Sequence, residues 1–160
     1  MPACAFRANI VAYSISLQTY VRRRNGVPLG SPDSLKNMLT RSLGAGSFDA
    51  FWQYWNPIWG YYLSRYVMKP VNNVAPSWLA ILCTFLVSGL LHDIAISLVK
   101  WEVTWLFTPW FGFLSLLVIA GKVNLIRYDS IAWPGRALIN SSQVVAGFML
   151  TRYLLAVLPQ

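Results

Sequence analysis

The chain has 160 residues, of which 56% are hydrophobic and 11% are charged. Because an average soluble domain carries about 25% charged residues, this composition argues against a water-soluble protein and favours an integral membrane protein. The net charge of +8 does not indicate nucleic-acid binding, since the basic residues flank the apolar runs and form no stripe.

Residues 1–46 are predicted to form a partly apolar N-terminal segment followed by a basic cytoplasmic loop. Residues 1–21 lack the basic start and cleavage site of a signal peptide, so they predict an interfacial helix or the end of a membrane helix that begins outside this chain. Residues 22–46 are rich in loop-forming residues, and the arginines at 22–24 are typical of a segment that faces anionic headgroups. A short amphipathic helix over residues 35–43 is expected within this loop.

Residues 47–160 are predicted to form the membrane core, which begins with an amphipathic aromatic segment over 47–68. Large apolar residues recur there at helical spacing and make one broad apolar face. Pro57 cannot continue the helical hydrogen bonding, and it disfavours a helical conformation at Asn56. We therefore expect a break at this point, in an element that lies at the membrane interface or re-enters it.

Three apolar segments follow, over residues 78–99, 105–121 and 137–158, and each approaches the roughly 20 residues that cross a bilayer. Spanning segments must be helices, because unpaired backbone groups cannot face lipid. The distribution of Lys and Arg predicts that residues 22–76 and 122–136 are cytoplasmic. The expected fold is an all-α integral membrane protein with about three transmembrane helices plus amphipathic interfacial or re-entrant helices.

The one histidine of the chain, His92, lies in the first of these spans. Thr84, Ser88 and His92 follow each other at four-residue spacing, so they form a polar stripe that should face protein or a water-filled cavity. A packing role, with one hydrogen bond to another helix, explains the stripe equally well. Asp93 lies about 100° further round the helix, so it is expected to hold a different helix or to lie near a polar mouth.

A buried imidazole is kept neutral by desolvation, and a neutral ring can take a proton from a hydroxyl group that attacks an acyl carbon. Such a reaction also needs a donor where negative charge develops on oxygen, and Asn56 is the best available side chain. The alternative for Asn56 is a helix terminator before proline. No metal is predicted, because one histidine and two distant cysteines (Cys4, Cys83) form no ligand set, and a lone histidine supports haem only weakly.

Two segments together resemble the membrane-bound O-acyltransferase (MBOAT) superfamily. "FWQYWNP" is similar to its F-W-x-x-W-[N/H] element, and "SGLLHD" is similar to its Ser-Gly/Ala-x-x-His-[Asp/Glu/Gly] signature. The matching residues are Phe51, Trp52, Trp55 and Asn56 in the first, and Ser88, Gly89, His92 and Asp93 in the second. The residues of the two segments are similar to those of the wax-synthase-like and bacterial branches. The Phe-Tyr-x-Asp-Trp-Trp-Asn motif of sterol and diacylglycerol acyltransferases is not present.

The resemblance implies a transferase that moves an acyl group from acyl-CoA or another acyl thioester, entering from the cytoplasmic side, to a hydroxyl acceptor. It implies that His92 is the catalytic base and Asn56 its partner, with no cofactor. Further residues are expected to contact substrate: Trp52, Trp55, Thr84, Ser88 and Asp93.

Members of this superfamily are usually far longer, and three spans with one amphipathic element cannot enclose a reaction chamber alone. We therefore expect a partial MBOAT-like fold: the C-terminal part of a longer or split enzyme, a chain that assembles with a partner membrane subunit or a second copy, or a degenerate remnant. The alternative function is a non-catalytic membrane subunit or pseudoenzyme, in which His92 only packs against neighbouring helices. In either case membrane lipids are expected partners.

Overall fold

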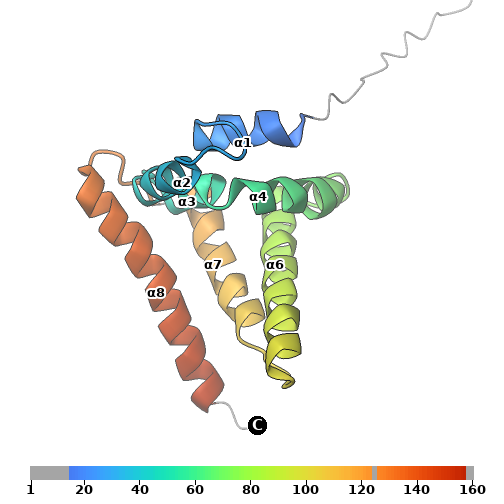
Figure 1. Ribbon diagram of the computed structural model, residues 1–160. Helices are drawn as coiled ribbons and strands as arrows, with labels where there is room; N and C mark the ends of the chain where they lie inside the picture. The colour runs from blue at the N-terminus through green and yellow to red at the C-terminus, as the bar shows by residue number, and fades with distance from the viewer. Residues whose placement is uncertain (1–14, 124–125, 158–160) are drawn as a thin grey trace, which may run out of the picture.

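The computed structural model describes residues 15–123 and 126–157, and every regular element within these ranges is a helix (Figure 1). The predicted segment before residue 15 and the last residue of the predicted span 137–158 lie outside the described residues. The helices are α1 (Leu17–Asn25), α2 (Ser34–Leu43), α3 (Phe48–Tyr54), α4 (Pro57–Leu63), the π-helix η1 (Ser64–Met68), α5 (Lys69–Asn72), α6 (Ser77–Lys100), α7 (Phe107–Lys122) and α8 (Trp133–Val157). The all-helical prediction is confirmed for this part of the chain.

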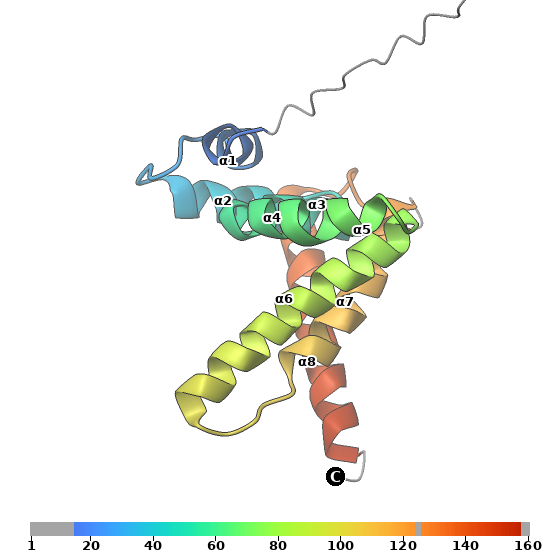
Figure 2. The same cartoon turned by 90° about the vertical axis from the view of Figure 1, so that its right-hand side faces the viewer.

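The helices form two groups, because α1 to α5 lie as a layer across one end of α6, α7 and α8 (Figures 1 and 2). Within the described residues, α6 alone is both long and apolar enough to cross a membrane, with 24 residues and a mean hydropathy of 2.1 in its most apolar window. Helix α7 is apolar but has 16 residues. Helix α8 has 25 residues, and its sequence includes the polar run 140–143 and Arg152.

Helix α1 continues through the arginines at 22–24, where the sequence predicts a loop, so that prediction is wrong. The helix is defined by its ends: the Ser16 hydroxyl accepts a hydrogen bond from the Thr19 N–H at 3.3 Å. Gly26 ends it in the left-handed conformation with φ 83°, which costs glycine little. The helix predicted over 35–43 is confirmed as α2.

The break predicted at Asn56–Pro57 is also confirmed, since α3 ends at Tyr54 and α4 begins at Pro57. Asn56 itself is left-handed, with φ 40° and ψ 70°. A non-glycine residue in this region is strained, and asparagine tolerates it better than most. The segment predicted as one amphipathic element over 47–68 is therefore two short helices separated by Trp55 and Asn56, followed by the π-helix η1.

The apolar core lies where α3 packs against α6 and α7. Its buried members are Ala45, Phe48, Phe51, Ile81, Leu114 and Val118. Phe48 and Phe51 are the buried aromatic residues of α3 in this core, so the layer is attached to the long helices partly through Phe51 of the first motif.

A second attachment joins the start of α8 to the connection between α2 and α3. Asn140 is fully buried, and its Nδ2 donates to the carbonyl oxygens of Leu43 and Ala45, each at 2.9 Å. The Tyr128 hydroxyl donates to Asn140 Oδ1 at 2.5 Å. Burial, together with the negative charges of Asp49 and Asp129, raises the pKa of Tyr128 to about 12.

Candidate active site

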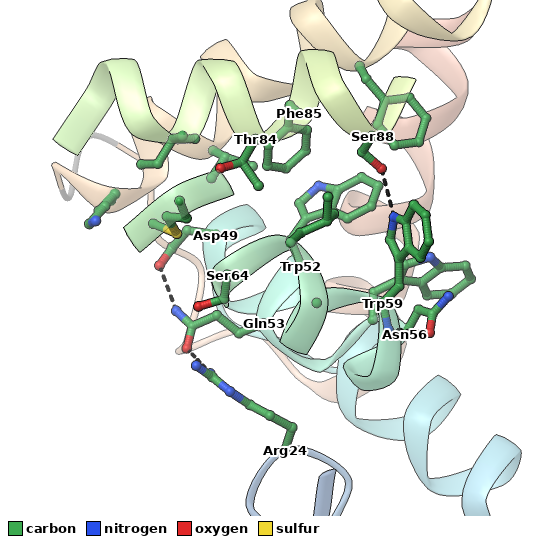
Figure 3. Close-up of a pocket in the computed structure, with 18 of the residues that line it drawn as sticks. Arg24, Asp49, Trp52, Gln53, Asn56, Trp59, Ser64, Thr84, Phe85 and Ser88 are labelled. Atoms are coloured by element: carbon green, nitrogen blue, oxygen red, sulfur yellow. Dashed lines mark hydrogen bonds between the residues drawn. The ribbon is translucent and has the colours of Figure 1, made fainter. Parts of the chain in front are cut away.

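A cavity of about 370 Å³ lies between the layer and the α6–α7 pair, and its size is typical of a small-molecule site. Aromatic and aliphatic side chains line most of it (Figure 3). Six of the seven predicted site residues line this one cavity: Trp52, Trp55, Asn56, Thr84, Ser88 and His92. The structure therefore brings the two motifs together.

His92 lies on the cavity-facing side of α6, half-buried among aromatic rings. Its Nδ1 is 2.6 Å from the backbone carbonyl oxygen of Ser88, one turn earlier. A carbonyl oxygen can only accept, so Nδ1 carries a proton, and in the neutral ring Nε2 has the lone pair. Nε2 makes no hydrogen bond to any residue that the structure describes.

Trp59 is the site residue that the sequence did not reveal. Its backbone N–H donates to Asn56 Oδ1 at 3.2 Å, and its indole Nε1 donates to the Ser88 hydroxyl at 2.9 Å (Figure 3). Its ring also meets the imidazole of His92 edge to face, with centroids 6.0 Å apart. Trp59 thus joins Asn56 to the polar stripe, a link that no spacing in the sequence predicts.

Asn56 is the N-cap before α4, and its side chain is exposed at the cavity rather than bonded to His92. Because only its oxygen can accept the hydrogen bond from Trp59, its amide nitrogen is left with two donor hydrogens. Asn56 is therefore the helix-capping residue that the sequence suggested, and it also has a donor free to meet a ligand.

Trp52 of α3 also lines the cavity. Its indole Nε1 is buried and has no hydrogen-bond partner among the described residues. The ring is held in place by Phe85 and Phe111, with centroid separations of 5.1 and 5.9 Å. A buried, unpaired N–H costs free energy, so a ligand oxygen that accepts from it would be stabilised.

The remaining stripe residue, Thr84, uses its hydroxyl within its own helix. It donates to the carbonyl oxygen of Ala80 at 2.6 Å, which leaves its methyl group and oxygen lone pairs at the cavity wall. In the described ranges, no group of three His, Cys, Asp or Glu side chains lies close enough to hold a metal ion.

Asp93 does not line the cavity, in contrast to the prediction that it contacts substrate. Its carboxylate is buried and accepts hydrogen bonds from the backbone N–H groups of Leu106, Phe107 and Thr108. It therefore holds the first turn of α7, which agrees with the other expectation for Asp93, that it holds a different helix.

The side of the cavity away from His92 is polar. The Arg24 guanidinium donates to Gln53 Oε1, and Gln53 Nε2 donates to Asp49 Oδ2 at 3.4 Å (Figure 3). Lys122, at the end of α7, also lines the cavity. The cavity thus combines an aromatic region around His92 with a charged region near α1 and the end of α7.

The protein-family model described as MBOAT, membrane-bound O-acyltransferase family, matches residues 28–124. This match covers more than half of the chain and includes both motifs. The chain belongs to the MBOAT family. No curated protein and no solved structure matches the chain significantly.

Membership of the MBOAT family confirms the resemblance seen in the sequence. The family is membrane-integral, which agrees with the apolar helix α6, and it implies O-acyltransferase activity in general. The matched region contains every residue of the cavity that belongs to α3, α4, α6 and α7, whereas α8 follows it.

Proposed function

We propose that this protein is a multi-pass membrane O-acyltransferase that moves an acyl group from acyl-CoA or another acyl thioester to a hydroxyl acceptor. The observation that carries the proposal is the hydrogen bonding of the two ring nitrogens of His92. Its Nδ1 proton is bound by the Ser88 carbonyl oxygen, and its Nε2 lone pair is unused in a cavity lined by both family motifs.

In the proposed reaction, Nε2 of His92 takes the proton of the acceptor hydroxyl while the hydroxyl oxygen attacks the thioester carbon. The carbon–sulfur bond then breaks, the new ester forms, and the thiolate that leaves takes the proton from the imidazolium. Proton transfer by a positioned side chain typically contributes about 10²–10⁴-fold in rate. The hydrogen bond from Nδ1 to the Ser88 carbonyl oxygen keeps the ring in the tautomer that this step requires.

The carbonyl oxygen of the donor becomes negative in the transition state, and we propose that Asn56 and Trp52 donate to it. Both have N–H groups without a partner in the described structure, and both lie on the α3–α4 side of the cavity. Removal of one such donor typically costs about 10²–10³-fold in rate. We further propose that Trp55, Thr84 and Ser88 contact the substrates through the aromatic and hydroxyl surfaces they present.

We also propose that α6, α7 and α8 all span the membrane and that the layer lies on its cytoplasmic side. Basic residues support this topology, because they gather where the layer meets the long helices: Arg65 and Lys69 before α6, Lys122 at the end of α7, and Arg136 in the first turn of α8. The Lys and Arg bias of short loops is the usual determinant of orientation. A partner membrane subunit or a second copy would then close the sides of the cavity that this chain leaves open.

The test is acyl transfer by membranes from cells that express the protein, incubated with radiolabelled palmitoyl-CoA. The label is followed into lipid, polysaccharide and protein fractions. We expect His92→Ala to lose about 10²–10⁴-fold of the transfer and Asn56→Ala about 10²–10³-fold. Mass-spectrometric lipid profiling of the same cells identifies the acceptor from the product that is lost with His92.

Ser115→Ala is the matched control, because Ser115 is a buried polar residue of α7 whose hydroxyl bonds only to the Gly112 carbonyl oxygen. It should leave transfer unchanged. Equal transfer by the wild type and His92→Ala would exclude the proposal. Lower abundance of His92→Ala without any acyl transfer in the wild type would instead favour the packing role of a non-catalytic subunit.

A further inference from the structure

The connection between α6 and α7 covers residues 101–106, and its last residue is bound by Asp93 of α6, one residue after the histidine. Asp93 Oδ1 accepts from the N–H groups of Leu106 and Phe107 at 2.9 and 2.7 Å, and Oδ2 accepts from Thr108 N–H at 2.8 Å. The side chain is 2% exposed. These N–H groups belong to the first turn of a helix and have no partner within that helix, so the carboxylate satisfies three donors at once.

Gly89 meets the same turn of α7 from one helical turn earlier. A Cβ at this position would lie 2.7 Å from the carbonyl oxygen of Phe107 and 2.7 Å from Thr108 Cα. Both atoms are backbone, so no side-chain rotation could relieve the contact. Gly89 and Asp93 are four residues apart and face the same way on α6, and together they receive the start of α7.

The turn that they hold carries the rings that surround His92. Phe107 lies 5.5 Å and Phe111 lies 5.2 Å from the imidazole, measured between ring centroids. On its other side the imidazole meets Trp59, as described above. Two of its three ring neighbours therefore depend on where α7 begins.

We infer that Gly89 and Asp93 form one docking device that fixes α7 and so positions the imidazole of His92, and that Asp93 is a positioning residue rather than a substrate ligand. Asp93 acts through α7, because both of its oxygens accept from α7 backbone and no hydrogen bond joins it to His92 in the described residues. The inference rests on the proposed function only in treating His92 as the reacting base.

The experiment uses the fact that His92 is the one histidine of the chain. The protein is labelled with ¹³C,¹⁵N-histidine and phenylalanine and placed in phosphatidylcholine nanodiscs, so all imidazole signals arise from one ring. The wild type should show cross-peaks from the His92 ring to Phe107 and Phe111 and the upfield ring-current shifts that such contacts cause. Asp93→Ala should lose these signals, and Asp93→Asn should lose part of them, since an amide keeps one acceptor oxygen.

Gly89→Ala is the second variant, because it disturbs the same contact and leaves every hydrogen-bonding group in place. It should lose the same cross-peaks as Asp93→Ala, while the imidazole contact with Trp59 and the Nδ1–H tautomer remain in both. Glu102→Gln is the matched control, since it removes an exposed carboxylate from the same connection, and it should match the wild type.

Retention of the phenylalanine cross-peaks in Asp93→Ala or in Gly89→Ala would overturn the inference, and so would their loss in Glu102→Gln. Absence of acyl transfer in the wild type would count against the proposed function instead, because these signals do not depend on it. Where transfer is present, Asp93→Asn should lower kcat for palmitoyl-CoA with little change in KM, since the residue positions the base without contacting the donor.

Discussion

Helices α7 and α8 are joined to the rest of the molecule in different ways. The start of α7 is held by a carboxylate, and its backbone lies directly on Gly89 of α6. Helix α8 is held by Asn140 near its own start, at the layer, and contacts α7 where Gly147 faces the side chains of Leu114 and Phe113.

The difference shows how polar groups decide the geometry of a membrane protein. Lipid tails are as apolar as leucine side chains, so apolar contact alone gives helices little reason to choose one partner. In both regions a buried polar side chain instead satisfies backbone groups that would otherwise be unpaired. The α6–α7 contact adds close backbone packing beside the histidine, whereas the α7–α8 contact is made by side chains.

The largest effect on stability is expected where α8 is attached. Asn140→Leu would leave the carbonyl oxygens of Leu43 and Ala45 and the Tyr128 hydroxyl without a partner, at a cost of about 3 kcal/mol. Unfolding by SDS in mixed micelles, followed by circular dichroism, measures this. The control is Thr151→Val, which removes a hydroxyl that bonds only to the Gly147 carbonyl oxygen of α8 itself, and it should cost about 0.5 kcal/mol. Equal losses in the two variants would show that Asn140 is no anchor.

The two glycines allow a direct comparison of the two contacts. Gly89→Ala should destabilise the protein by about 1–3 kcal/mol, because the added methyl group would clash with backbone of α7. Gly147→Ala places its Cβ 2.9 Å from Leu114 Cδ2, the end of a flexible side chain that can move away. Alanine also has the higher helix propensity by about 1 kcal/mol, so Gly147→Ala should be nearly neutral. The same unfolding assay measures both variants. A larger loss of stability for Gly147→Ala than for Gly89→Ala would show that the α7–α8 contact is the tighter of the two.

The smallest effect is expected at Tyr128. Tyr128→Phe removes the hydrogen bond to Asn140 and should cost about 1 kcal/mol near neutral pH. Folding raises the pKa of the phenol from 10.0 to about 12, so the folded state favours the neutral form. The stability that this provides is fully present below pH 10.0 and is lost as the pH rises towards about 12.

Tyr128→Phe should therefore lack this alkaline loss of stability, and the two proteins should become more alike as the pH rises. Unfolding curves at several values between neutral pH and about pH 12 test this. If the free energy of unfolding falls equally in both proteins, a group other than Tyr128 causes the alkaline loss of stability.

Much of the fold follows from patterns in the chain. The apolar run that became α6, the amphipathic helix α2 and the break before Pro57 depend on hydrophobic periodicity and on proline, which act locally. The helix α1 was not predicted through its arginines, because its ends depend on a serine cap and a left-handed glycine that composition alone hides. The π-helical turns of η1 likewise had no signal in the sequence.

The site was predictable to a similar extent. The two motifs named His92 and Asn56, and the four-residue spacing put Thr84, Ser88 and His92 on one face, which does line the cavity. Trp59 was not predicted because its role depends on contacts with Ser88 and His92 of α6, about 30 residues away in the chain. The sequence also grouped Asp93 with the substrate-binding residues, since a carboxylate beside a histidine gives no sign that its partners lie 13 to 15 residues away on another helix.

The amino-acid sequence by itself determined the class of the protein, the identity of its family and the position of its histidine. These depend on composition and on motifs whose residues are neighbours along the chain. The tertiary structure decided that Nε2 of His92 has no partner among the described residues, that Trp59 links Asn56 to Ser88, and that Asp93 accepts from the backbone of α7 and does not line the cavity. Each of these depends on which donors and acceptors meet when separate helices pack, and hydrogen-bond partners in a packed interior are chosen by distance and not by order in the sequence.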